Sequence, residues 1–378
     1  QVNLQELEIR YRTGQPAAQV RFTAQPIVER SSIEPAAFPY RLEKLQGTIF
    51  FAQDQVFWRD FRAEHGQVRI AADVFGRFQP DGAWRLEMEN LFIDRLPMDR
   101  ELTKALPEQL KKAFAALNPE GALALRGRWE LAQPADPAAG QTSQWDLTLA
   151  LVGVHLHPGI SLEHIHGGVH LAGHYTGQEY RSWGELELDS LVYQGCQITQ
   201  IQGPFWIDSQ YILFGPDAET RRRSYLAQYK DAASQADGDQ SARLITGQWF
   251  GGQMTGQGWI RIGPDAEFAL RATVSDAGLA RIAQEHLPGI QDLRGKVYGW
   301  VYLHGQGKNL HGLTGRGALH LREADLYELP VMIALLKVLN LRRPDTNAFS
   351  ACDLEYRIAG PHIYLDRIVF QGDAVSLH

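Results

Sequence analysis

The sequence predicts a mostly β protein: a long, curved antiparallel sheet that forms an elongated U-shaped apolar groove, with a few short helical insertions. Apolar and polar residues alternate with period two along most of the 378 residues, as in Trp145-Asp146-Leu147-Thr148-Leu149, and this is typical of strands with one buried face. Turn signals recur at intervals of about 8–14 residues, which suits antiparallel meanders. There is no alternation of strand and helix patterns, which disfavours a parallel doubly wound sheet.

A short unit, Leu or Ile followed by any residue and then Gly, recurs between the predicted strands. It ends at Gly47, Gly167, Gly203, Gly247, Gly295 and Gly315. Glycine permits a bulge or bend in a strand. Repeated bends would let one sheet curve along its length.

Helix-forming residues interrupt the strand pattern in four places. These are residues 98–117, 217–236, 276–287 and the most apolar one, 330–341. We expect residues 1–289 to form a repetitive β-groove segment containing the first three helices. Residues 290–378 would then form a C-terminal region with the fourth.

The charge and cysteine content narrow the possible functions. The net charge is −7, which disfavours duplex nucleic acid because phosphate binding needs a clustered basic surface, and we expect no nucleic-acid partner. Two cysteines are too few for a disulfide framework or a cysteine-rich zinc site. No stretch reaches the ~18 apolar residues that span a bilayer. Both ends read as interrupted strands, so we expect a fragment of a longer protein whose membrane anchor lies outside it.

Histidines are the only conspicuous candidates for chemistry. Six fall within twenty residues: His155, His157, His164, His166, His170 and His174. An H-x-H pair on a strand places both rings on one face, which suits a metal. No acid or cysteine follows at a matching spacing, so we expect wet-face residues, no metal and no cofactor.

Other motifs favour a protein that is not an enzyme. The glycine run 247–258 contains no Gly-Lys-Ser or Gly-Lys-Thr and predicts a hairpin. No nucleophile-elbow or zinc-protease motif occurs, although a spatial pair of carboxylates would escape notice. The run from Arg221 to Arg223 reads as a solvated helix face or a contact for anionic headgroups.

The side chains of every second residue in each strand would line the groove. We predict that its lining includes five strand pairs: Ile49 and Phe51, Val68 and Ile70, Leu147 and Leu149, Leu186 and Leu188, and Val301 and Leu303. Acyl chains could lie on such a surface while their headgroups stay in water, since each buried methylene contributes ~0.8 kcal/mol.

The 330–341 helix would close or gate this groove. Its apolar stripe consists of Met332, Leu335, Leu336 and Leu339. Arg342 and Arg343 follow at its C-terminus, where cations favour the helix dipole and could contact lipid phosphate. Packing as ordinary core is the alternative interpretation of this helix.

The C-terminal third resembles the AsmA-like family of bacterial envelope proteins. The resemblance rests on an ordered set over residues 290–378: the glycine-rich strand 313–319, the Leu-Pro apolar helix 329–339, and the strands 349–358 and 363–372. It implies a membrane-anchored, periplasmic protein similar to bridge-like lipid transfer proteins. Such a protein conducts phospholipid between the inner and outer membranes and supports outer-membrane biogenesis and lipid homeostasis.

The expected partners are therefore phospholipid acyl chains, with inner- and outer-membrane proteins as further candidates. Membrane contact would come mainly through parts outside this sequence. The main alternative is a structural β scaffold, an envelope assembly factor whose open sheet edge accepts a client strand. A polysaccharide-active β-solenoid is a second alternative and would need an acidic, aromatic cleft.

Overall fold

The computed structural model describes residues 1–11, 19–35, 38–106, 108–157, 160–229, 243–263, 267–286, 293–306, 310–324, 350–371 and 376–377. Most of these residues lie in strands, and the strands belong to one antiparallel hydrogen-bonded sheet. The predicted class, a mostly β antiparallel sheet with short helices, is confirmed. The predicted groove shape stays a prediction.

The described chain divides into two compact units. Unit 1 consists of Gln1–Leu156, Glu163–Glu187 and Trp206–Gln210, and unit 2 of His157–Leu162, Leu188–Phe205 and Tyr211–His378. The predicted boundary at residue 290 falls in the segment 287–292, outside the described residues.

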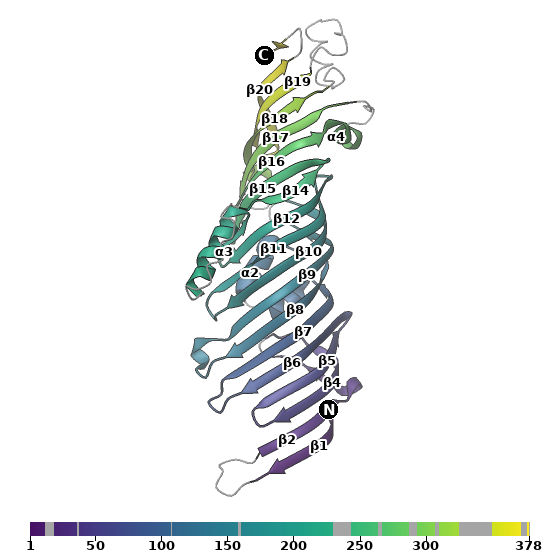
Figure 1. Cartoon of the computed structure of the whole chain (residues 1–378), viewed down its shortest axis with the longest axis vertical. Helices are drawn as coiled ribbons and strands as arrows, with labels where there is room; N and C mark the ends of the chain where they lie inside the picture. The colour runs from purple at the N-terminus through teal and green to yellow at the C-terminus, as the bar shows by residue number, and fades with distance from the viewer. Residues whose placement is uncertain are drawn as a thin grey trace. The chain divides into compact units, whose positions relative to one another are not determined.

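In unit 1 the strands pair antiparallel with their neighbours in the chain, except that β2 pairs with β4 across the two-residue β3 (Figure 1). They are β1 (Val2–Arg10), β2 (Gln19–Pro26), β3 (Ser32–Ile33), β4 (Leu42–Ala52), β5 (Gln55–His65), β6 (Val68–Phe78), β7 (Trp84–Pro97), β8 (Ala122–Gln133), β9 (Thr142–Leu156) and β10 (Leu162–Tyr175). Strands β11 (Tyr180–Tyr193) and β12 (Cys196–Asp208) contribute residues to both units.

In unit 2, β14 to β20 continue the same meander, while β13 pairs with β15. The strands are β13 (Tyr211–Phe214), β14 (Ile245–Trp249), β15 (Gly252–Arg261), β16 (Glu267–Gly278), β17 (Lys296–Gln306), β18 (Thr314–Arg322), β19 (Ala351–Ala359), β20 (His362–Gln371) and β21 (Ser376–Leu377).

Short helices occur where three of the four insertions were predicted. They are α1 (Arg100–Ala105), α2 (Glu108–Leu117), α3 (Pro216–Tyr229) and α4 (Leu279–His286), with 3-10 turns η1 (Val28–Arg30), η2 (Pro137–Ala139) and η3 (Leu310–Gly312). The Asp99 carboxylate starts α1 by accepting from the backbone N–H groups of Glu101 and Leu102. The predicted 330–341 helix lies outside the described residues.

The recurring glycines have two different roles. Gly47 has φ +106°, and a Cβ there would lie 2.5 Å from the Arg59 carbonyl oxygen. It sits where the pairing of β4 with β5 shifts register, so the predicted bulge is confirmed. Gly315 instead lies in regular strand opposite Leu303 and Ile358, where its missing side chain makes room for theirs.

Each unit has its own buried cluster. In unit 1, β5, β6 and β7 pack with α1 and with the segment before β4, burying Phe61, Val68, Leu91, Leu102 and Tyr40. In unit 2, α4 packs its Leu279 and Ala283 against the ends of β16 to β20, including Val297 and Phe370. The buried apolar side chains of each cluster stabilise their own unit.

Candidate functional site

The strands of unit 1 share an apolar face, defined here by Phe51, Trp58, Val74, Met88 and Trp129. Cross-strand register places Phe51 opposite Val56, Trp58 opposite Val74, and Met88 opposite both Val74 and Trp129. The opposite face, called the polar face here, carries charged residues such as Glu87 together with the exposed rings of Phe50 and Phe92. This is the alternation that the sequence predicted, now in register from strand to strand.

Unit 2 has an apolar face of the same kind. Val301 pairs with Ala272 on one side and Gly317 on the other, and Leu303 pairs with Leu270 and Gly315. Further along, Leu319 is opposite Leu354, which is opposite Ile368. All three of these leucine and isoleucine side chains are half-buried, so no second layer of the described chain fully covers this face.

Cross-strand register places eight of the ten predicted lining residues on these apolar faces: Ile49, Phe51, Val68, Ile70, Leu147, Leu149, Val301 and Leu303. Leu186 and Leu188 share the parity of Tyr180, whose ring stacks on Trp145 of the unit 1 apolar face. The register thus assigns eight of the ten side chains to the apolar faces, and that they line a groove stays a prediction. Their contact with lipid stays a prediction.

The ten residues differ in accessibility. Ile49, Phe51, Leu147, Leu149, Leu186 and Val301 are half-buried, whereas Val68, Ile70, Leu188 and Leu303 are buried. Val68 and Ile70 belong to the cluster that includes Tyr40 and Leu102. These two positions are protein core, because Tyr40 before β4 and Leu102 of α1 are buried in one cluster with them.

The predicted gate and headgroup contacts, Met332, Leu335, Leu336, Leu339, Arg342 and Arg343, lie outside the described residues. Their roles stay predictions.

Glycines on the apolar face of unit 2 were missed as lining residues by sequence reasoning. A Cβ at Gly317 would collide with the Tyr356 hydroxyl, and one at Gly305 would collide with the Phe268 ring. Each glycine faces the bulky residue directly across the strand pair. The large side chains therefore lie over the glycine backbone, which flattens the face. The signal available in the sequence was a glycine two residues away from an apolar residue of the same strand, which places both on the same face.

The polar face of unit 1 contains an open hollow of about 690 Å³ between β7, β8 and β9. Its lining combines the charged side chains of Glu89, Arg126, Arg128 and Asp146 with the apolar side chains of Leu91 and Phe92.

The histidines do not converge on one point. The rings of His155 and His164 are 5.1 Å apart, while His170 Nε2 lies 2.8 Å from Asp146 Oδ1 on the polar face. Among the residues that the structure describes, no group of three His, Cys, Asp or Glu side chains is arranged to hold a metal ion.

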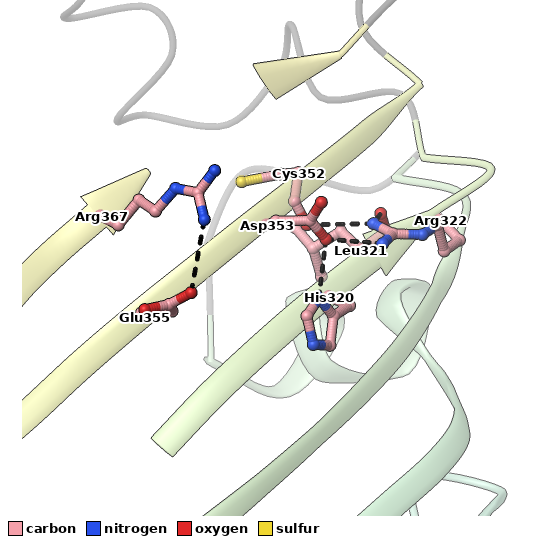
Figure 2. Close-up of polar contacts among 7 residues, drawn as sticks. All are labelled: His320, Leu321, Arg322, Cys352, Asp353, Glu355 and Arg367. Carbon is pink, nitrogen blue, oxygen red and sulfur yellow. Dashed lines mark hydrogen bonds and ion pairs between the residues drawn. The ribbon is translucent and has the colours of Figure 1, made fainter. Parts of the chain in front are cut away.

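A polar cluster lies on β18 and β19 (Figure 2). His320 Nδ1 and Arg322 Nη2 each lie 2.6 Å from Oδ1 of Asp353. Burial alone would raise the pKa of Asp353, but the hydrogen bonds from His320 and Arg322 outweigh it and hold that pKa below its ordinary value. Arg367 and Glu355 form a separate, looser pair at 3.7 Å. These contacts join neighbouring strands.

The two cysteines are not activated as nucleophiles. Burial, with the nearby Glu285 carboxylate, raises the pKa of Cys196, which lies 3.3 Å from His286 Nε2. Burial and Asp353 raise the pKa of Cys352 to about 11. Since the thiolate is the reactive form, both thiols are predominantly protonated at neutral pH.

No helix within the described ranges has the length and apolarity to cross a membrane. Comparison with protein-family models, curated proteins and solved structures gives no match.

Proposed function

We propose that this chain is a non-enzymatic phospholipid-binding and transport protein whose apolar strand faces hold acyl chains. The supporting observation is the register: apolar side chains occupy the same face of successive strands in each unit and are only half-covered. An exposed apolar surface of this extent gains free energy when an apolar ligand covers it.

The apolar faces present few polar groups, so they would hold different acyl chains with similar affinity. Sliding an acyl chain along such a face exchanges one apolar contact for another, with little net change in buried area. This supports transport along the face. The proposed setting, between the inner and outer membranes of a bacterial envelope, follows from the AsmA-like resemblance.

The test is extraction of lipid from the purified full chain followed by mass spectrometry. We expect phospholipids in reproducible stoichiometry and their exchange for an added acyl-chain photocrosslinking probe. Crosslinks should map to apolar-face residues such as Leu149 and Val301. A lipid-free protein that also fails to take up the probe would contradict the proposal.

A second function, acceptance of a client strand, is favoured by the edge of β20. Within the described residues, β21 pairs only with Phe370 and Gln371 of β20. Residues His362–Arg367 are exposed, with Ile363 at 66% and Leu365 at 54%. An exposed strand edge with apolar side chains is a template for strand addition. Crosslinking from position 363 to a protein rather than to lipid would support this alternative.

A further inference from the structure

A row of arginine and tyrosine side chains crosses the polar face of unit 2 (β16 to β20 in Figure 1). Register places Arg271 opposite Tyr302, Tyr302 opposite Arg316, Arg316 opposite Arg357, and Arg357 opposite Tyr364. All five side chains are exposed. We call this set the arginine–tyrosine row.

The charges on these strands do not cancel. Every acidic side chain of β16 to β20 has an ion-pair partner: Glu267 with Arg261, Asp276 with Lys296, Asp353 with Arg322, Glu355 with Arg367, and Asp366 with Arg357. Arg271 and Arg316 have no acidic partner among the described residues. The positive charges of Arg271 and Arg316, one on each side of Tyr302, are therefore not neutralised by an acidic side chain.

The row also places like charges together. Arg316 lies directly across the strand pair from Arg357, and like charges directly opposite destabilise a sheet. The Arg357 guanidinium is held by both oxygens of Asp366 and lies 5.8 Å from the Tyr364 ring centroid. An anion bound beside Arg316 would relieve the repulsion without breaking that pair.

Aromatic side chains lie along the same row: Tyr302 between Arg271 and Arg316, and Tyr364 opposite Arg357. Tyr302 is 40% exposed, Tyr364 49%, and Trp300, two residues from Tyr302 on the same face, 36%. Tyrosine and tryptophan are the side chains enriched at the headgroup level of bilayers, and arginines near an anionic leaflet are attracted to it.

We propose that the arginine–tyrosine row, together with Trp300, docks unit 2 onto the surface of an anionic phospholipid bilayer. The row extends across five strands and presents its charges outward, which fits a surface of many headgroups. The inference goes beyond the proposed function, since it concerns the face opposite the acyl-binding one.

The test is flotation of the full chain with phosphatidylcholine vesicles, with and without phosphatidylglycerol. We expect binding only to the phosphatidylglycerol vesicles and a decrease with added salt. The double variant Arg271→Gln/Arg316→Gln should bind about thirtyfold more weakly, since each arginine near an anionic surface contributes about fivefold. Trp300→Ala/Tyr302→Ala should weaken the binding that persists at high salt.

Arg62→Gln/Arg126→Gln is the matched control. It removes the same charge from exposed strand positions of unit 1 and should float like the wild type. Circular dichroism of each variant verifies its fold. Equal loss in both double variants, or no flotation of the wild type, would overturn the inference. Binding to a soluble acidic peptide but not to vesicles would overturn it in favour of a protein partner. Leu149→Asp should still float, which separates this inference from the proposed function.

Discussion

Trp145 of β9 stacks on Tyr180 of β11 by passing over Gly173 of β10. The ring centroids of Trp145 and Tyr180 are 5.3 Å apart with an interplanar angle of 18°, and a Cβ at Gly173 would lie 2.5 Å from the indole. Ser182, buried on β11, donates to the Ala172 carbonyl oxygen beside them. The two rings thus meet across β10 at Gly173, where no side chain stands between them. The apolar face therefore continues from β9 to β11.

Trp145 and Trp129 are cross-strand neighbours with different hydrogen bonding. Trp129 Nε1 donates to Ser143 Oγ at 2.6 Å, whereas Trp145 Nε1 is buried without a partner among the described residues. Both Trp→Phe changes lose packing, but only Trp129→Phe loses a hydrogen bond. We expect it to lower the free energy of unfolding by about 1 kcal/mol more than Trp145→Phe in urea titrations. The reverse order would contradict the assigned hydrogen bonds.

Gly317→Ala should destabilise the protein by about 1–3 kcal/mol, because the added Cβ would lie 2.6 Å from the Trp300 carbonyl oxygen and would also collide with the Tyr356 side chain. Gly263→Ala is the control, since no atom of the described residues lies within 4 Å of a Cβ there. Urea unfolding of both variants gives the comparison. If the two changes have the same effect, β17 and the Tyr356 side chain do not pack this closely around Gly317 in solution.

Leu149→Asp should reduce acyl-probe crosslinking several-fold, because a carboxylate on the apolar face must be desolvated by a bound acyl chain. Thr148→Asp is the matched control: the neighbouring residue lines the polar hollow of the other face and should crosslink like the wild type. Crosslinked lipid is quantified by mass spectrometry after each variant is shown to fold. Equal crosslinking in both variants would count against an acyl path over Leu149.

Asp353→Asn should lower the free energy of unfolding at pH 7 by about 1 kcal/mol, the range of a partly exposed charge pair. The native pKa of Asp353 is lowered, so its contribution is complete above the unfolded-state pKa. It is lost as the pH falls through the native pKa. The difference between variant and wild type should therefore vanish in strong acid.

Glu355→Gln tests the looser pair with Arg367 in the same region (Figure 2). Both partners are more than half exposed, so the change in the free energy of unfolding should be near zero at every pH.

A pH-independent cost for Asp353→Asn in the same titrations would show that the carboxylate charge does not stabilise β18 and β19.

The sequence by itself determined the class of this fold. Period-two alternation is a local property, so Leu147 and Leu149 could be assigned to one face of a strand without knowing their neighbours. The helical insertions near α1, α3 and α4 were equally local, because helical spacing and helix-forming residues lie within single segments.

Tertiary structure decided which residues meet. Val68 and Ile70 have the same pattern as Leu147 and Leu149, yet Tyr40 and Leu102 are packed into one cluster with them, and no alternation within β6 could show that cover. The arginine–tyrosine row needs the register of five strands from Arg271 to Tyr364. Register depends on pairing between distant segments and on bulges that shift it, and neither is encoded in the local pattern of any one strand.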